Sequence, residues 1–327
     1  MGGQLGFLYR QLTFIPKPLA TSSLEGKVAL ITGANIGLGF EAARELASCK
    51  LSRLIVAVRD PIKGENTRQT ILTEAPSCHV EVWIVDYDQY DGIIAFAKRI
   101  AELDQLDYVL LSAGLKQMEY STSHTGHETN VQINHIAASL LSLLLLPTLL
   151  RLSRSTGNPL RLTIVSSEGH FWIPFKERTA ANILKRMDEP ETFGTAMQRY
   201  CTTKLINVLW TRELASRVSE HEVIINTVNP GFCYSGLHRH VKTGAGIMNI
   251  VLWMIGRTTA QGGHCLTDAL VEHEDSHGRY LSEQQITDPS SFVLSMEGEV
   301  AQKQVWRETI ELLKHEAPNA DISFFSE

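Results

Sequence analysis

The stretch Thr32-Gly33-Ala34-Asn35-Ile36-Gly37-Leu38-Gly39 decides how this chain folds. It follows a β-branched apolar run at 27–31, typical of a buried strand, and it precedes residues 40–47, which predict a helix. Glycines let the backbone approach a phosphate closely, and the first N–H groups of the following helix point at the same place. The glycines at 33, 37 and 39 depart from the common G-x-G-x-x-G spacing. The stretch alone therefore predicts an anion site, with an ordinary tight turn as the alternative.

Apolar β-branched runs alternate with helical patterns along most of the chain. Strands are predicted at 53–58, 79–85, 106–111, 160–165 and 223–228, and helices at 63–72, 92–103, 128–152 and 195–218. This alternation predicts an α/β fold, a doubly wound parallel sheet with helices on both faces. In such sheets ligands bind beyond the carboxyl ends of the strands, and the polar and glycine-rich signals of this sequence fall there.

We expect an N-terminal arm and one large domain. The arm is residues 1–23, and the domain is residues 24–327, including a substrate lid at 238–260 and a C-terminal helix and tail at 300–327. The arm mixes apolar and polar residues without the continuous apolar run of a signal peptide. We interpret it as a segment that packs on the body, with a weak membrane-surface or partner contact as the alternative.

The composition of the 327 residues bounds the function. A net charge of −6 offers no sign of the basic face that a nucleic-acid partner favours. The five cysteines are scattered and odd in number, which indicates a reducing compartment, and we expect a cytoplasmic protein. The leucine-rich run 140–152 contains Pro147 and is shorter than the roughly 20 residues of a membrane span. We therefore expect no integral membrane segment, and we interpret this run and 246–256 as buried or interface helices.

Arg59 follows the second predicted strand, near where the second ribose of a dinucleotide would lie, and Lys63 comes four residues later. A guanidinium suits the 2′-phosphate of NADP(H), whereas an Asp or Glu would suit a bare diol. These residues favour NADP(H) over NAD(H), with a solvated strand-end arginine as the alternative. Asp86, after the third strand, is interpreted as an acceptor for the adenine amino group or as a helix cap.

Tyr200-Cys201-Thr202-Thr203-Lys204 places a phenol and an ammonium four residues apart, on one face of a predicted helix. A nearby cation favours the phenolate and would lower the tyrosine pKa from about 10. Such a tyrosine can donate a proton to a carbonyl oxygen as a hydride arrives, or take one from an alcohol. Ser167, after the fifth strand, can supply a hydroxyl to the same substrate oxygen.

Together these motifs resemble those of the short-chain dehydrogenase/reductase family, in the family's order, over about residues 26–237. The matching positions are the T-G-x-x-x-G-x-G turn at Thr32–Gly39, the Asn-Ala-Gly motif at Ser112-Ala113-Gly114, the helix asparagine Asn134, the serine Ser167, the Tyr-x-x-x-Lys pair Tyr200 and Lys204, Pro230-Gly231, and Ser235 in place of a threonine. Arg59-Asp60-Pro61 and the long gap between Ser167 and Tyr200 are similar to the classical NADP-dependent branch, like retinol dehydrogenases, and to fungal reductases of secondary metabolism.

The resemblance implies a single Rossmann-type domain and a role for each matching residue. Tyr200 would be the general acid and base, and Ser167 would polarise the substrate oxygen. Lys204 would hold the nicotinamide ribose and lower the pKa of Tyr200, while Asn134 would order a water in a proton relay. The residues expected to bind NADP(H) are Thr32, Gly33, Asn35, Ile36, Gly37, Leu38, Gly39, Arg59, Lys63, Asp86, Ser112, Ala113, Gly114, Tyr200, Lys204, Pro230, Gly231 and Ser235.

The sequence departs from the family pattern in two places. Ser112 replaces the usual asparagine, which removes no catalytic group, and Glu168–Arg199 is longer than in the simplest members. We interpret this long segment as an insertion over the active site. Within it, the aromatic cluster 169–172 either lines the substrate pocket or packs the insertion.

Other features complete the expected site. Phe232, Cys233 and Tyr234 should lie near the nicotinamide end, and the apolar side chains of the lid suggest an apolar substrate. The four histidines 124, 127, 238 and 240 have no companion ligands at metal-binding spacing, so we expect no metal.

The resulting hypothesis is an NADP(H)-dependent oxidoreductase. It would transfer a hydride between nicotinamide and a carbonyl or secondary alcohol of a hydrophobic small molecule, with secondary-metabolite biosynthesis as the expected setting. One alternative is a cofactor-binding scaffold without turnover, and another is a non-redox enzyme such as a cyclase or isomerase. The resemblance also implies a homodimer or homotetramer that associates through the long helices 128–152 and 195–218.

Overall fold

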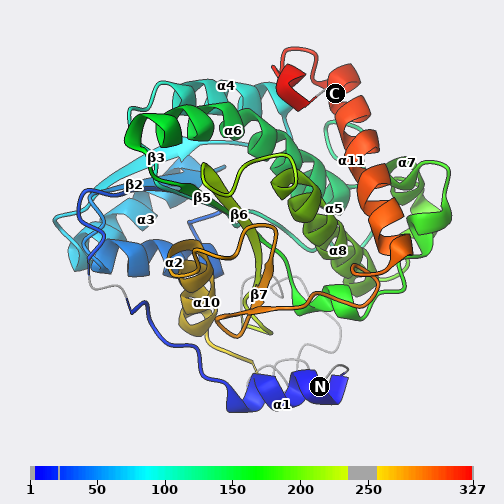
Figure 1. Cartoon of the computed structure of the whole chain (residues 1–327), viewed down its shortest axis with the longest axis horizontal. Helices are drawn as coiled ribbons and strands as arrows, with labels where there is room; N and C mark the ends of the chain where they lie inside the picture. Colours follow the sequence, from blue (N-terminus) through cyan, green and yellow to red (C-terminus); the bar gives the residue numbers. More distant parts are fainter. Residues whose placement is uncertain (1–3, 21–22, 235–255, 326–327) are drawn as a thin grey trace.

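A computed structural model describes residues 4–20, 23–234 and 256–325 of the chain. Its centre is a single eight-stranded sheet in the order β3-β2-β1-β4-β5-β6-β7-β8, in which neighbouring strands are parallel except for the antiparallel pair β7 and β8 (Figure 1). The strands are β1 (Val28–Thr32), β2 (Arg53–Val58), β3 (His79–Ile84), β4 (Tyr108–Leu111), β5 (Leu160–Val165), β6 (Val223–Asn229), β7 (Tyr280–Ser282) and β8 (Gln285–Thr287). The predicted doubly wound parallel sheet is confirmed.

Helices cover both faces of this sheet. The α-helices described are α1 (Gln4–Thr13), α2 (Gly37–Ser48), α3 (Pro61–Glu74), α4 (Tyr90–Ala101), α5 (Thr129–Val131), α6 (Ala137–Thr156), α7 (Ile183–Met187), α8 (Ala196–Ala215), α10 (Thr259–Val271) and α11 (Met296–Glu316). One apolar core lies between the sheet and α2, α3 and α10, and a second lies between the sheet and α4, α6, α8 and α11. Strands buried on both faces explain why β1, β5 and β6 read as continuous apolar runs.

The predicted helix at 128–152 is divided into three pieces. Between α5 and α6 lies a π-helical segment, Gln132–Ile136. The helix then continues through Pro147, although a proline removes one hydrogen bond. Packing offsets that loss, because the leucines on both sides of Pro147 are fully buried. Residues 129–156 are long and apolar enough to cross a membrane, but 83% of the relevant window is buried inside the protein. The prediction of a buried helix is confirmed.

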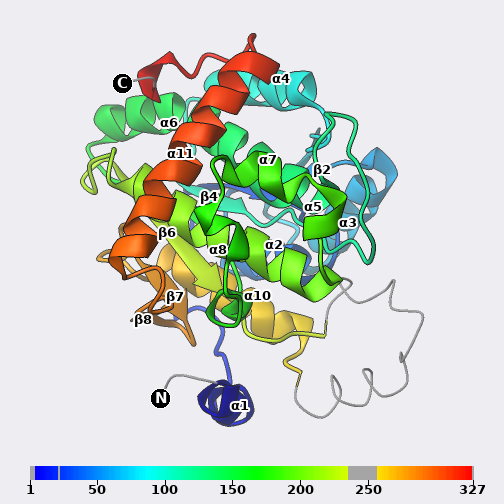
Figure 2. The ribbon, with the colours of Figure 1, turned by 90° about the vertical axis from the view of Figure 1, so that its right-hand side faces the viewer.

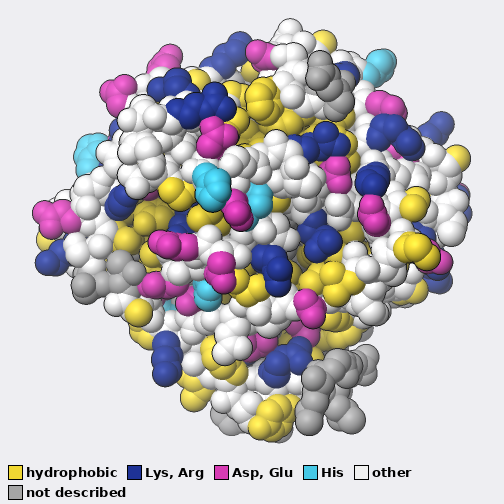
Figure 3. Space-filling model, viewed as in Figure 1, with side chains coloured by type: hydrophobic (Ala, Val, Ile, Leu, Met, Phe, Trp, Pro, Cys, Tyr) yellow, Lys and Arg dark blue, Asp and Glu magenta, His cyan; other side chains and the backbone are white. Residues whose placement is uncertain are grey.

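The arm, whose structure the sequence did not specify, forms α1, which is followed by residues 14–19 without helix or strand. Phe7 and Gln11 are buried against the body, so the arm packs on it as expected. The opposite face of α1 exposes Leu8, Tyr9 and Leu12. In Figure 3 hydrophobic side chains reach the surface at the lower edge, where α1 lies in Figure 1. A membrane or partner contact of this outer face stays a prediction.

The C-terminal region is a long helix, as predicted, and it runs across α8 beside α7 (Figure 2). The Trp306 ring stacks on Trp210 of α8 at 4.6 Å, and the Arg217 guanidinium lies 4.3 Å from the Trp306 ring centroid. The α11 carboxylate of Glu308 accepts hydrogen bonds from the first two backbone N–H groups of α7. Helix α11 therefore occupies one side of α8. A subunit contact through residues 195–218 would have to involve α11, and the oligomer stays a prediction.

Trp306→Ala should lower the free energy of unfolding by roughly 3–5 kcal/mol, because it removes a buried indole and leaves a cavity between α8 and α11. Urea unfolding followed by circular dichroism measures this change. Met296→Ala is the matched control, since Met296 lies in the same helix and is 85% exposed. A loss below about 1 kcal/mol for Trp306→Ala would show that α11 adds little to the core.

Candidate active site

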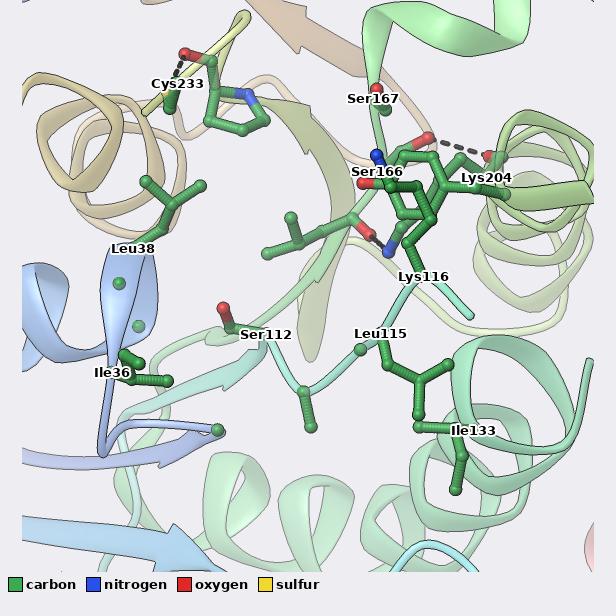
Figure 4. A pocket seen from close by; sticks show the side chains of 18 of the residues that line it. Ile36, Leu38, Ser112, Leu115, Lys116, Ile133, Ser166, Ser167, Lys204 and Cys233 are labelled. Carbon is green, nitrogen blue, oxygen red and sulfur yellow. Dashed lines mark hydrogen bonds between the residues drawn. The ribbon is translucent and has the colours of Figure 1, made fainter. Parts of the chain in front are cut away.

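A cavity of about 500 Å³ opens at the carboxyl ends of the parallel strands. Figure 4 shows Ile36 and Leu38 on one side of it and Lys116, Ser167 and Lys204 on the other. The predicted site residues that line it are Gly33, Asn35, Ile36, Gly37, Leu38, Gly39, Arg59, Lys63, Asp86, Ser112, Ala113, Gly114, Ser167, Tyr200, Lys204, Pro230 and Gly231. Thr32 and Asn134 support this lining from behind, as described below. Ser235 and most of the predicted lid lie outside the described residues.

The turn after β1 is closed by contacts that exclude a side chain. A Cβ on Gly33 would stand 2.8 Å from the Cα of Ala113, and one on Gly39 would stand 2.7 Å from the carbonyl oxygen of Gly33. Gly33 and Gly37 also have positive φ angles, which L side chains rarely adopt. Ile36 precedes α2 and offers no side-chain cap among the described residues, so the first N–H groups of α2 are available to an anion in the cavity.

Thr32 ties this turn to the neighbouring loop after β4. Its Oγ1 accepts hydrogen bonds from the backbone N–H groups of Ser112 and Ala113, at 3.1 and 3.2 Å. The Tyr87 hydroxyl donates to the same oxygen at 3.1 Å. Thr32 is fully buried. Its hydroxyl is directed to protein groups and supports the lining of the cavity, and its predicted contact with a cofactor stays a prediction.

Arg59 and Lys63 line the cavity where β2 ends and α3 begins. Asp60, between them, accepts hydrogen bonds from the backbone N–H groups of Ile62 and Lys63 and so caps α3. Asp86 also lines the cavity, and its carboxylate accepts from the backbone N–H of Asp88 at 3.1 Å. Two cations thus lie beside the end of β2, as the predicted 2′-phosphate site requires, and Asp86 stabilises the turn after β3.

Asn134 lies in the π-helical segment, a distortion that often marks functional sites. Its Oδ1 accepts from the Leu115 N–H at 2.8 Å, and its Nδ2 donates to the Leu115 carbonyl at 2.9 Å and to Thr203 at 3.1 Å. The side chain therefore joins the loop after β4 to α8, the helix of Tyr200. The proposed role in ordering a water stays a prediction.

Tyr200, Ser167 and Lys204 meet at the other end of the cavity. Burial raises the pKa of Tyr200, and a hydrogen bond with the Ser167 side chain opposes that effect. Lys204 Nζ donates a hydrogen bond to the Val165 carbonyl at 2.8 Å. The same Nζ lies 5.8 Å from the centroid of the Tyr200 ring. Burial lowers the pKa of this ammonium to about 8. Desolvation of the buried phenolate thus shifts the Tyr200 pKa in the direction opposite to the lowering expected from Lys204, whose role at a nicotinamide ribose stays a prediction.

Pro230-Gly231 closes the cavity beyond β6. The Asn229 side chain accepts from the Gly231 N–H at 2.9 Å and from the Glu168 N–H at 2.9 Å, so it joins this loop to the residue after Ser167. Gly231 has a φ of +80°, and a Cβ there would collide with the Arg257 guanidinium, which itself donates to the Pro230 carbonyl. Phe232 and Cys233 line the cavity as predicted, while Tyr234 is exposed.

A family model described as short chain dehydrogenase matches residues 27–172. The chain is 53% identical to "Short chain dehydrogenase sol3" of Alternaria solani, over 88% of this chain and 99% of that one. It belongs to the short-chain dehydrogenase/reductase family of oxidoreductases. It is also 37% identical to "Short chain dehydrogenase/reductase mfmJ" of Annulohypoxylon moriforme, over 90% of this chain and 86% of that relative.

Solved structures show the same fold at low sequence identity. One is titled "Pseudomonas aeruginosa RhlG/NADP active-site complex", with a TM-score of 0.62, 20% identity, and coverage of 81% of this chain and 96% of that one. Another is a short-chain dehydrogenase from Sphingobium yanoikuyae in complex with NADPH, with a TM-score of 0.56, 17% identity, and coverage of 72% and 81%. These likenesses support the Rossmann-type architecture of this short-chain dehydrogenase/reductase.

The segment Glu168–Arg199 covers less of the site than predicted. Its two ends contribute Gly169, Trp172 and Met197 to the cavity. Its middle holds α7, which packs against α11 instead. The prediction of an insertion over the active site is therefore wrong for α7, because Glu308 and the apolar side of α11 offer this segment a partner. The aromatic cluster is divided too: Trp172 lines the cavity, whereas His170 and Phe171 pack near Tyr280.

The sequence prediction missed several lining residues, among them Phe7, Lys116 and Met197. Lys116 is only 7% exposed, and burial lowers its pKa. Lys116 stands two residues after Gly114, so its closeness in the sequence to the Ser112-Ala113-Gly114 motif could have predicted a place in the cavity lining. Phe7 had no such signal, because only the docking of α1 brings it to the cavity.

His170 should make the fold sensitive to acid. Its Nδ1 is bonded to the Ser167 carbonyl and its Nε2 accepts from the Ser290 N–H, an acceptor that protonation removes. Burial lowers its pKa to about 4 from 6.5. The neutral form is therefore favoured on folding, and this stabilisation is complete above pH 6.5 and lost as the pH falls towards 4.

Between pH 6.5 and pH 4 the native protein should lose up to about 3 kcal/mol of unfolding free energy through His170. We expect His170→Asn to be free of this pH-dependent loss. Urea unfolding at pH 7, 5.5 and 4 measures the slope. His79→Asn, at an exposed histidine, is the control and should keep the native slope. Equal slopes in the His170 variant and the native protein would contradict the assignment.

Proposed function

We propose that this protein is an NADP(H)-dependent oxidoreductase acting on a carbonyl or secondary alcohol of a hydrophobic small molecule. The observation that carries the proposal is the layout of one cavity. Its first end has the glycine turn, the N-terminus of α2 and Arg59, and its second end has Tyr200, Ser167 and Lys204. The distance between the ends is bridged by the loop after β4, which lines the cavity with Ala113 and Gly114.

The residues present fit a dinucleotide with a 2′-phosphate. Gly33 and Gly39 leave room for a close approach that a Cβ would prevent, and the N-terminus of α2 would hold the pyrophosphate. Arg59 and Lys63 would pair with the 2′-phosphate. When bound, this cofactor supplies or accepts the hydride.

The protein's own groups would manage the proton and orient the substrate. Ser167 would donate a hydrogen bond to the substrate oxygen, and Tyr200 Oη would transfer a proton to it. Tyr200 is protonated at neutral pH, so its phenol can act as the proton donor in carbonyl reduction. Lys204, tied to the Val165 carbonyl, would hold the nicotinamide ribose. The lining contains many apolar side chains beside a few polar groups, which supports a hydrophobic substrate.

We further propose a cytoplasmic protein that serves secondary metabolism. Two of the solved structures with this fold are complexes with NADP or NADPH, which supports the choice of cofactor. A cofactor-binding scaffold is disfavoured because Asn134, Ser167, Tyr200 and Lys204 are all present and converge. A non-redox cyclase or isomerase is distinguished by product mass, since reduction adds two hydrogens.

Arg59→Asp should weaken NADPH binding at least ten-fold, about 1.4 kcal/mol, because it replaces a cation beside the expected 2′-phosphate with an anion. Titration of NADPH fluorescence measures the dissociation constant, with NADH as the comparison nucleotide. Lys98→Asp makes a comparable charge change at an exposed position on α4 and should leave both nucleotides unaffected. Failure of the native protein to bind either nucleotide would refute the proposed function.

Tyr200→Phe should reduce turnover of any accepted ketone by a factor of at least about 100, because it removes the proposed proton donor while keeping the aromatic ring. NADPH oxidation and the mass of the product report this loss. NADPH binding should stay within two-fold of the native value, on the order of 0.4 kcal/mol. Undiminished turnover in this variant would rule out Tyr200 as the general acid.

A further inference from the structure

Helix α1 lies against the substrate end of the cavity and contributes to its wall. Phe7 lines the cavity and is 8% exposed. Its ring meets Trp172 edge to face, with centroids 5.0 Å apart and planes at 75°. Trp172 itself lies shortly after Ser167 and also lines the cavity. Two aromatic rings from segments far apart in the sequence thus form one surface beside the catalytic serine.

Gln11 holds α1 to the loop after Pro230-Gly231. Its Nε2 donates to the Phe232 carbonyl at 2.8 Å, and its Oε1 accepts from the Phe232 N–H at 3.1 Å. One buried amide therefore satisfies both backbone groups of a residue that lines the cavity. This pairing is specific in register, because a shift of α1 by one residue would break both hydrogen bonds.

Arg10 makes a second, charged attachment. Its guanidinium lies 2.6 Å from Glu168 Oε1 and 3.3 Å from Glu283 Oε2. Glu168 directly follows Ser167 and is buried. Phe7, Arg10 and Gln11 are spaced i, i+3 and i+4, so they share one face of α1. That face is turned to Glu168, Trp172 and Phe232, all three of which line the cavity.

The groups around this wall favour an aromatic ring. Phe7 and Trp172 present π surfaces, and aromatic pairs gain more than their buried area alone provides. Met197 lines the same cavity with a polarisable sulfur, which packs well on ring edges. The buried ammonium of Lys116 also lines it, and a cation favours an electron-rich ring or a phenolic oxygen. A saturated ring would gain only the free energy of burying its apolar surface, without the additional aromatic interactions.

We propose that α1 is the outer wall of the substrate site, that Phe7 with Trp172 determines specificity, and that the substrate is an aromatic ketone or the corresponding benzylic alcohol. This inference rests on the proposed function and deepens it. Gln11 is a positioning residue that acts through the docking of α1. The arm is then a functional part of the site, and the exposed Tyr9 on its opposite face has no part in it.

The test compares 1-tetralone with 1-decalone, two fused-ring ketones of similar size of which only the first has an aromatic ring. The native protein should reduce 1-tetralone with at least a ten-fold higher kcat/KM. Phe7→Ala should lower that ratio at least five-fold, mainly because the aromatic ketone binds more weakly and its KM rises. Tyr9→Ala should keep the native ratio. The ratio does not depend on how much protein is folded, so it separates specificity from stability.

Gln11→Met keeps the side-chain length and removes both hydrogen bonds to Phe232. It should reproduce at least half of the loss of ratio seen in Phe7→Ala, because α1 is no longer held in register. A native ratio in Gln11→Met would overturn the positioning role. A native ratio in Phe7→Ala, or no preference of the native protein for 1-tetralone, would overturn the aromatic wall.

Calorimetry separates failure of this inference from failure of the proposed function. Absence of NADPH binding refutes the proposed function, whereas NADPH binding with unselective ketone reduction refutes only the aromatic wall. Binding of 1-tetralone to the native protein in the presence of NADP⁺ should be weakened at least five-fold by Phe7→Ala. If 1-tetralone neither binds nor reacts, the aromatic substrate class is wrong.

Discussion

The structure depends on the close contact between the turn after β1 and the loop after β4. Gly33 approaches the Cα of Ala113 so closely that no side chain fits, and Thr32 accepts hydrogen bonds from two consecutive N–H groups of that loop. Parallel strands β1 and β4 are neighbours in the sheet, so their carboxyl ends lie side by side. This contact fixes one side of the cavity, because the turn after β1 and the loop after β4 both line it.

Hydrogen bonds continue from these two loops to the helix that carries the residues proposed to be catalytic. Asn134 holds the backbone of Leu115 with two hydrogen bonds and donates a third to Thr203, one residue before Lys204. The π-helical turn at Asn134 makes this possible, since it widens the helix at the point where the loop must be met. The loop after β4 and helix α8, which line the proposed cofactor and catalytic ends of the cavity, are thereby held in a fixed relation to each other.

A second group of polar contacts lies at the end of the cavity near Ser167. Glu168, next to Ser167, is buried between Arg10 and the Asn229 side chain, and burial raises the pKa of its carboxyl to about 7. Arg257 meets Glu283 at 3.3 Å and the Pro230 carbonyl at 3.2 Å. Buried charges are costly unless they are paired, so these contacts specify one arrangement of α1, β6 and the Pro230-Gly231 loop. Arg10 also lies 3.3 Å from Glu283, so this group of charges joins segments that are more than 200 residues apart.

The sequence by itself determined the parallel sheet and the ends of its strands. Runs such as 53–58 and 160–165 are buried on both faces, and burial on both faces leaves a continuous apolar pattern that is readable without a structure. The glycine turn, Arg59 and the Tyr200–Lys204 pair were readable as well, because each is a local motif. Tertiary structure decided what depends on distant partners. The middle of residues 168–199 turned towards α11 because Glu308 caps α7. Helix α1 brought Phe7 to the cavity because Gln11 pairs with Phe232, and desolvation raised the pKa of Tyr200 despite Lys204.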